Sequence, residues 1–299
     1  MEQIISSQIS SHLIITCAQV FSHKVGFSAA YLMQAGSGDT IGKSYKYFCH
    51  DYGVPEHRNF DGSIAQVGKN TLFMKTINKY GTGYHDSSPR IPNENLLEGA
   101  ISEIKKRWYR IMLKNKVTKI LWDYGLIWIR ETGNLSVSSS RYASDRTPLE
   151  YITVDTPDII EYLYFTFYYW ITYRTNYGLG EMSIGRWLGV SHKVGHMIYY
   201  WVITVSGNVI SFVTVQRLTN PERNTDEWSH RMREYHIAIE QKLDIKDADL
   251  SKDLVMVELW NKLTVADKDR EFLDEYNSLI SDGSISNGKE DNKIDDKEK

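Results

Sequence analysis

Glu98 is followed at helical spacing by a run of basic residues. Lys105 and Lys106 lie about two helical turns beyond Glu98, and Arg107 and Arg110 come next. A carboxylate beside such a surface suits a metal ion held next to a phosphate backbone. An ordinary solvated helix face has the same composition, so the residue types alone leave both interpretations open.

Two further groups have residue types that do chemistry. Asp61 precedes Gly62, which fits either a metal ligand at the end of a strand or an ordinary tight turn. His192 and His196 are four residues apart, a spacing that suits zinc on a helix. Because they fall in a loop between predicted strands with no third ligand, we predict no zinc site there.

The helix that positions Glu98 is predicted from its apolar periodicity. Pro92 and Asn93 stand where a helix start is expected, and the helix continues to about Lys116. Five apolar residues recur at spacings of four and three, so they line one face: Leu97, Ile101, Ile104, Trp108 and Ile111. Glu98, Lys105 and Lys106 fall outside that face and are expected to meet solvent.

Strands and helices alternate before this helix, which is typical of an α/β layer. No element is predicted in residues 1–12. The predicted strands are 13–21, 26–33, 56–60 and 82–86, and the predicted helices are 40–52 and 70–80.

The pattern changes after residue 116. Helices are predicted at 119–133 and from Thr147, and Asp123 and Glu131 are interpreted as local caps or ion pairs in the first of them. Four β-like stretches follow and predict a small antiparallel barrel or sheet: 165–174, 185–191, 197–205 and 208–216. We expect its aromatic residues to be core rather than a base-stacking platform: Trp187, Tyr200 and Trp201.

Composition and charge narrow the class of protein. The two cysteines of the 299-residue chain have no metal-ligand or disulfide pattern, which favours a reducing compartment. No signal peptide is recognised, and the apolar run 162–173 is too short to span a bilayer, so we expect an intracellular protein of the nucleus or cytoplasm without a membrane partner.

The charge is unevenly distributed along the chain. Residues 1–221 carry 22 Lys and Arg against 17 Asp and Glu, whereas residues 222–299 carry 13 against 21. A basic body with a concentrated cationic segment fits a polyanionic partner. In the acidic part, surface helices are predicted at 225–243 and 267–280, and a disordered end at 281–299.

Several stretches, in order, resemble the integrase portion of a copia-type LTR retrotransposon polyprotein. They cover roughly residues 13–222 and are 17–21 (CAQVF), 61–62 (DG), 88–98 (SPRIPNENLLE), 121–124 (LWDY), 146–150 (RTPLE), 185–190 (GRWLGV) and 215–220 (VQRLTN). The resemblance implies an RNase H-like mixed sheet with flanking helices at 1–120, a helical connector at 121–164, a small β-barrel module at 165–222 and an acidic, partly disordered tail at 223–299.

The resemblance also implies a reaction and its residues. It implies metal-dependent phosphoryl transfer that integrates DNA, with an Asp, Asp, Glu triad holding Mg²⁺ or Mn²⁺. Asp61 and Glu98 match the second and third members of that triad and would be both metal ligands and catalytic residues. The residues expected to meet nucleic acid are Asn95, Lys105, Lys106 and Arg110. The implied partners are retrotransposon ends, target DNA and further copies of the chain.

The chain departs from the family's pattern at the first Asp. The position expected for it falls on Gln3, where Glu2 is the only acidic neighbour. Either Glu2 substitutes after a slip of one residue, or the first strand and its ligand have been lost. The zinc-binding N-terminal module of integrases is also not found, so we expect an N-terminally truncated integrase with a truncated or degenerate first strand and impaired activity. The alternative is a catalytically inactive remnant that binds nucleic acid, and a scaffold with no nucleic-acid role is a third option.

Overall fold

The computed structural model describes residues 2–5, 15, 17–61, 68, 70–87, 96–137, 145–174, 180–192 and 198–243, all within one compact unit, Met1–Ile245. Side chains are described for these residues except 2–5, 60–61, 86–87, 96–98 and 119. The segments predicted at 267–280 and 281–299 lie outside the described residues. No helix in the described part is long and apolar enough to cross a membrane.

The first sheet has three antiparallel strands with β2 in the middle: β1 (Glu2–Ile5), β2 (Cys17–Ser22) and β3 (Ser28–Met33). The first five residues of β2 are buried in succession, as expected for a strand covered on both faces. β1 corrects the expectation of no element in residues 1–12. Its four residues pair with β2 from Glu2 opposite Val20 to Ile5 opposite Cys17, a long-range pairing that local periodicity does not reveal.

The second sheet is parallel. It consists of β4 (His57–Asp61) and β5 (Gly83–Ser87), in register from His57 opposite Gly83 to Asp61 opposite Ser87. α3 (Leu72–Tyr80) supplies the crossover that parallel strands need, and α1 (Gly38–Tyr52) precedes β4. Strands and helices therefore alternate as predicted. The described strands form one antiparallel and one parallel sheet, so the single mixed sheet that the resemblance implies stays a prediction.

The ends of α1 and α3 are fixed by local signals. The hydroxyl of Ser37 accepts a hydrogen bond from the backbone N–H of Thr40 at the start of α1. Gly53 ends α1 with φ of 87°, and Gly81 ends α3 with φ of 67°, both in a region that glycine adopts without steric cost. These signals explain why both helices were predicted within two residues of their observed ends.

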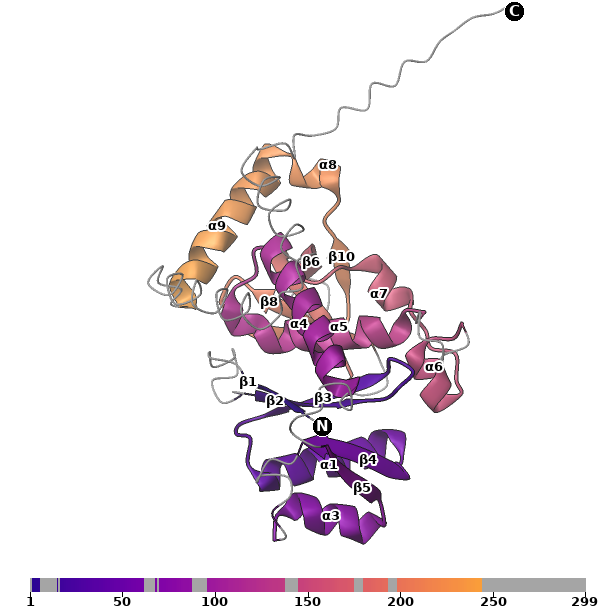
Figure 1. Ribbon diagram of the computed structural model, residues 1–299. Helices are drawn as coiled ribbons and strands as arrows, with labels where there is room; N and C mark the ends of the chain where they lie inside the picture. Colours follow the sequence, from indigo (N-terminus) through magenta and orange to yellow (C-terminus); the bar gives the residue numbers. More distant parts are fainter. Residues whose placement is uncertain are drawn as a thin grey trace, which may run out of the picture. The chain divides into compact units, whose positions relative to one another are not determined.

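Two long helices cover the first sheet. α4 (Leu96–Lys114) contacts β1 and β2, and α5 (Trp122–Leu135), which follows a 3₁₀ turn at Lys119–Leu121, lies beside α4 (Figure 1). The predicted apolar face of α4 is confirmed where side chains are described, because Ile101 and Ile104 are buried in the core of the first sheet, and Trp108 and Ile111 pack against buried clusters. Leu97 has no described side chain.

α5 belongs to two buried clusters and is more than a connector. Trp122 and Leu126 pack in the core that contains β2 and β3. Leu121 and Tyr124 pack in a second core with residues of the C-terminal strands. The helices α6 (Pro148–Thr153) and α7 (Ile160–Tyr164) follow, so the described parts of the predicted 121–164 connector include α5, α6 and α7.

The C-terminal part is a five-stranded antiparallel sheet in the order β10-β6-β7-β8-β9. Its strands are β6 (Trp170–Arg174), β7 (Met182–Ser191), β8 (Tyr199–Thr204), β9 (Val209–Phe212) and β10 (Val215–Arg217). The predicted antiparallel module is thus present, but β9 and β10 are opposite edges of the described sheet, so closure into a barrel stays a prediction.

Two strand predictions in this module are corrected. The strand expected from Phe165 begins only at Trp170, because Tyr168 has φ of 62°, a left-handed conformation that interrupts an extended strand. The strand expected over 208–216 is two strands, β9 and β10.

Packed structure continues beyond residue 222, where the sequence analysis ended the β-module. After the short α8 (Asn220–Arg223), α9 (Asp226–Lys242) contacts β7, and its Tyr235 and Ile239 are buried in the second core. The hydroxyl of Tyr235 donates a hydrogen bond to the backbone oxygen of Ile203 at 2.8 Å. The first helix of the acidic part is therefore docked on the sheet.

Candidate functional site

Asp61 is the last residue of β4, opposite Ser87 of the parallel strand β5. The carboxyl ends of parallel strands meet at one edge of a sheet, a position where ligand-binding residues gather in α/β proteins. The tight-turn interpretation of Asp61-Gly62 is not decided, since residues 62–67 and the side chain of Asp61 lie outside the described part.

Glu98 is the third residue of α4, so it lies in the first turn of this helix. α4 is held on the sheet by the burial of Ile101 and Ile104 and by its contacts with β1 and β2. Lys105 lies seven residues after Glu98, which places its Cα about 10 Å further along nearly the same side of the helix. The Glu98 side chain and all of Asn95 lie outside the described part.

β1 occupies the position expected to carry the first acid of the triad. Glu2 and Gln3 are its first two residues, and α4 contacts this strand. A short strand is therefore present at residues 2–5, whereas the departure in residue type remains, since the matching position is Gln3.

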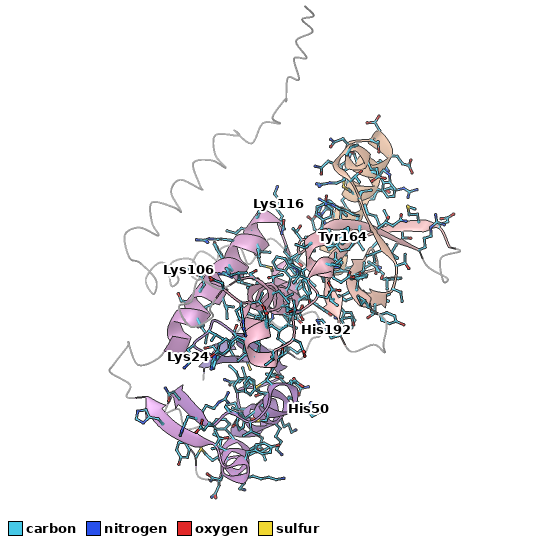
Figure 2. The ribbon with its side chains drawn as sticks, turned by 90° about the vertical axis from the view of Figure 1, so that its right-hand side faces the viewer. Lys24, His50, Lys106, Lys116, Tyr164 and His192 are labelled. Carbon is cyan, nitrogen blue, oxygen red and sulfur yellow. The ribbon has the colours of Figure 1, made fainter. Side chains whose placement is uncertain are left out.

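The basic residues of α4 differ in their surroundings. Lys105 and Lys106 are half-buried, and Arg110 is exposed. Arg107 is engaged within the helix, where its Nε donates to Glu103 at 2.9 Å. Lys106 lies midway along α4 and Lys116 lies just past its C-terminal end (Figure 2). The basic segment predicted from the sequence is thus a helix surface, only part of which is neutralised by Glu103.

The described side chains contain no ready-made metal site. Among the side chains described, no group of three or more His, Cys, Asp or Glu is arranged to hold a metal ion. Asp61 and Glu98, the two acids that the sequence resemblance assigns to metal binding, have no described side chain.

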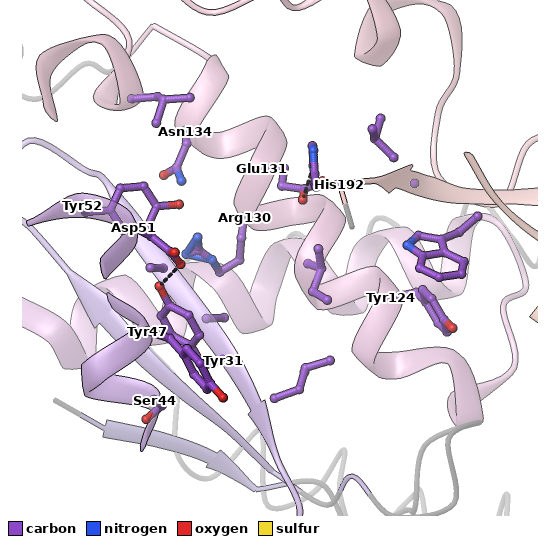
Figure 3. A pocket seen from close by; sticks show the side chains of 18 of the residues that line it. Tyr31, Ser44, Tyr47, Asp51, Tyr52, Tyr124, Arg130, Glu131, Asn134 and His192 are labelled. Atoms are coloured by element: carbon purple, nitrogen blue, oxygen red, sulfur yellow. Dashed lines mark hydrogen bonds and ion pairs between the residues drawn. The ribbon is translucent and has the colours of Figure 1, made fainter. Parts of the chain in front are cut away.

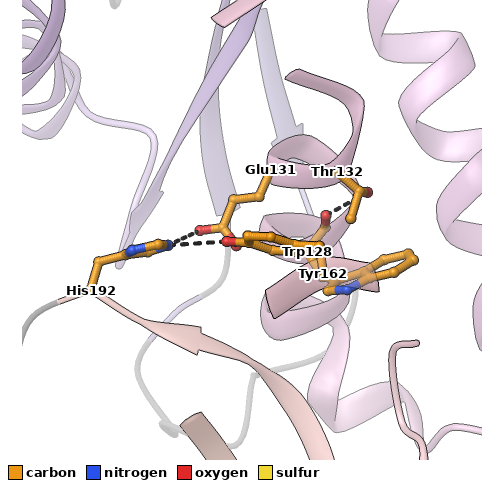
Figure 4. Close-up of polar contacts among 5 residues, drawn as sticks. All are labelled: Trp128, Glu131, Thr132, Tyr162 and His192. Carbon is orange, nitrogen blue, oxygen red and sulfur yellow. Dashed lines mark hydrogen bonds and ion pairs between the residues drawn. The ribbon is translucent and has the colours of Figure 1, made fainter. Parts of the chain in front are cut away.

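A polar cluster joins α5, α7 and the residue after β7, and no motif in the sequence predicts it. The hydroxyl of Tyr162 donates to Glu131 at 2.8 Å, and His192 Nε2 lies 2.9 Å from the other carboxylate oxygen of Glu131 (Figure 4). The hydrogen bond to Glu131 raises the pKa of His192, against the effect of burial. Glu131 was expected to be a local cap or ion pair, but the partners of its carboxylate are 31 and 61 positions away, so the local interpretation is wrong.

The histidine and aromatic interpretations can be compared with these contacts. His192 is paired with a carboxylate, and His196 lies outside the described residues. Trp187 is fully buried, and Tyr200 and Trp201 pack against buried clusters. The prediction that these aromatic residues belong to the core is confirmed.

Comparisons with known proteins gave structural neighbours only. No protein-family model matches the chain, and no curated protein matches it. The catalytic core domain of BIV integrase is similar with a TM-score of 0.39 and 13% identity, over 51% of this chain and 90% of that chain. The HTLV-2 integrase catalytic core domain in complex with magnesium is similar with a TM-score of 0.36 and 17% identity, over 46% of this chain and 84% of that chain.

A third neighbour is the simian T-cell lymphotropic virus intasome in complex with PP2A regulatory subunit B56 gamma. It gives a TM-score of 0.41 and 15% identity over 74% of this chain and 77% of that chain. At these scores the likeness decides neither the fold nor the function of the chain.

Proposed function

We propose that the chain is an integrase-like protein of copia-type retrotransposon origin whose RNase H-like core, about residues 1–120, performs metal-dependent phosphoryl transfer on DNA. The observation that supports this most is the position of the two motif acids. Asp61 ends a parallel strand, and Glu98 opens a helix that packs on the neighbouring sheet. Acids at such element ends are positioned by rigid secondary structure, as catalytic carboxylates require.

In this proposal Asp61 and Glu98 hold Mg²⁺ or Mn²⁺ through carboxylate oxygens, the hard ligands that these ions prefer. The bound metal would lower the pKa of an attacking hydroxyl and offset negative charge on the phosphate. Glu2 of β1 is the acid available for the first position of the triad. A Glu at the start of a four-residue strand is a weaker anchor than an Asp within a longer strand, so we propose impaired activity.

The α4 surface supplies the contacts to DNA. Lys105, Lys106 and Arg110 follow Glu98 on the same helix and would bind backbone phosphates beside the metal. The alternative function, nucleic-acid binding without catalysis, uses these same residues. It is favoured by Gln3, which puts an amide where the triad has an acid.

A strand-transfer assay with Mg²⁺ or Mn²⁺ tests the catalytic proposal. The matched control is Glu103→Gln, which removes an exposed carboxylate five residues further along α4. Activity abolished by Glu98→Gln and kept by Glu103→Gln would support the role of Glu98. Equal activity in both variants would refute it, and absence of turnover in the wild-type chain together with salt-sensitive DNA binding would favour the alternative.

A further inference from the structure

A cavity of about 1000 Å³ is lined by side chains of α1, β3, α5, β7 and β8. Much of its wall is apolar, formed by residues that include Leu32, Met33, Leu149, Leu188, Val190 and Trp201. Tyrosine rings from α1 and β3 line another side, with Tyr31 and Tyr47 stacked at a centroid distance of 6.4 Å (Figure 3). A half-open recess of this size is large enough to hold a small molecule.

Arg130 of α5 is the cation buried in this wall. Its residue surface is only 6% exposed, and its Nε and Nη1 have no hydrogen-bond partner among the described residues. Burial lowers the pKa of Arg130 to about 10, which still leaves the guanidinium charged at neutral pH. Glu131 interacts electrostatically with Arg130, but two buried N–H groups of the guanidinium have no hydrogen-bond acceptor among the described residues. Buried donors without acceptors are unfavourable, so an anionic ligand would stabilise this arrangement.

The carboxylates near Arg130 are committed to other groups. Asp51 accepts a hydrogen bond from the Tyr31 hydroxyl at 2.8 Å, and Glu131 is held by Tyr162 and His192. Neither makes an ion pair with Arg130 in the described structure. The guanidinium therefore has donor capacity that its own chain leaves unused.

We propose that this cavity binds a small apolar molecule with a single carboxylate, which accepts hydrogen bonds from the Arg130 guanidinium. The apolar wall suits the body of such a ligand. Asp51, Glu131 and Asp158 also line the cavity, and their negative charge disfavours a phosphate dianion or a nucleic-acid backbone. One carboxylate on an apolar body is the ligand chemistry that satisfies both features.

The position of Arg130 is fixed by its helix. Four residues further along α5, Asn134 forms two hydrogen bonds with the backbone of Ser28 in β3. Arg130 points from α5 toward the side of the cavity where Asp51 and Tyr52 are drawn (Figure 3). A charged donor held on a rigid element loses little freedom on binding, which favours a preformed site.

The test is calorimetric titration of the full chain with 2-naphthoate, with neutral 2-naphthamide and with inorganic phosphate. We expect naphthoate to bind at least tenfold more tightly than either of the others. Arg130→Met should weaken the binding of naphthoate at least tenfold. Lys43→Met, which removes an exposed cation of the same cavity, should leave the affinity for naphthoate within twofold of the wild type. The readout is independent of DNA chemistry, so its outcome is separate from the proposed function.

Folding of the variants is checked by thermal unfolding without ligand. Removal of an unpaired buried charge should leave the melting temperature of Arg130→Met equal to or above that of the wild type. Should this variant fail to fold, Arg130→Lys, which keeps the charge but loses the planar fork, should still weaken naphthoate severalfold. No binding of naphthoate, equal binding of the amide, tighter binding of phosphate, or an affinity unchanged by both Arg130 variants would overturn the proposal.

Discussion

Asn134 and Ser28 are 106 positions apart and are joined by two hydrogen bonds. The backbone N–H of Ser28 donates to Asn134 Oδ1 at 3.0 Å, and Asn134 Nδ2 donates to the backbone oxygen of Ser28 at 2.9 Å. Both residues are buried. One amide side chain thereby satisfies both backbone groups of an edge-strand residue and ties α5 to β3.

Replacement of Asn134 by Ala should therefore destabilise the protein strongly. Two buried backbone groups of Ser28 would lose their partners, at a cost of about 2–4 kcal/mol in the free energy of unfolding. Denaturant unfolding measures this cost. The control is Val137→Ala, an exposed residue just beyond the same helix, which should stay within about 0.5 kcal/mol. An equal effect of the two substitutions would contradict the role given to Asn134.

Docking of α9 on the C-terminal sheet predicts that substitutions on its two faces differ in their effect on stability. Tyr235 is 1% exposed and Ile237 is 56% exposed on the same helix. We expect Tyr235→Ala to cost about 3–5 kcal/mol by analogy with other buried aromatic residues. Ile237→Ala should be close to neutral in the same unfolding experiment. A small effect of Tyr235→Ala would show that α9 is not part of the packed structure.

Particular residues show how far the sequence could predict this fold. Ser37, Gly53 and Gly81 are local signals, and the helices they bound were predicted closely. β1 was missed because its strand character comes from pairing with β2, twelve or more positions away. The docking of α9 was missed for a similar reason. In the sequence, Tyr235 is a single aromatic residue in a polar helix, and its contact with Ile203 of the sheet is visible only in the folded structure.

The candidate sites divide in the same way. Asp61 and Glu98 were assigned by motif, and their roles stay predictions; Asp61 ends β4 and Glu98 lies in the first turn of α4. The cluster of Glu131, Tyr162 and His192, like the cavity around Arg130, has no motif, because its members come from elements far apart in sequence. Only the packing of α5 against two cores brings these side chains together.

The contact between His192 and Glu131 predicts a pH-dependent contribution to stability. Because the folded state raises the pKa of His192, protonated His192 stabilises the fold below its unfolded value of about 6.5, and this contribution is lost as the pH rises through the folded value. His192→Gln should therefore destabilise more at about pH 5.5 than at about pH 8.5. The difference should be at most about 1 kcal/mol, since the imidazole is largely exposed.

Urea unfolding of the wild type and His192→Gln at both pH values measures this difference. Glu131→Gln should show the same pH dependence, because it removes the other half of the pair. A stability difference that is larger at the higher pH would contradict the assignment.

DNA binding through α4 predicts a specific salt dependence. If Lys105 and Lys106 each contact a phosphate, replacing both with Ala should reduce the slope of log K against log salt by about 1.8 for duplex DNA. Fluorescence anisotropy over a salt series measures the slope. The control is Lys46→Ala on α1, an exposed lysine that should leave the slope unchanged. An unchanged slope in the double variant would exclude these two lysines as phosphate contacts.

The most direct test of the central proposal is Mn²⁺ binding followed by electron paramagnetic resonance, because it needs no catalytic turnover. If Asp61 and Glu98 hold one metal site, the wild type should bind Mn²⁺, and Asp61→Asn and Glu98→Gln should each weaken it at least tenfold, the order of loss expected when a metal site is disrupted. The double variant should bind Mn²⁺ about as weakly as each single variant, because both substitutions remove ligands of the same site. Glu103→Gln should bind as the wild type does. Mn²⁺ affinity unchanged by Asp61→Asn and Glu98→Gln would contradict the proposal.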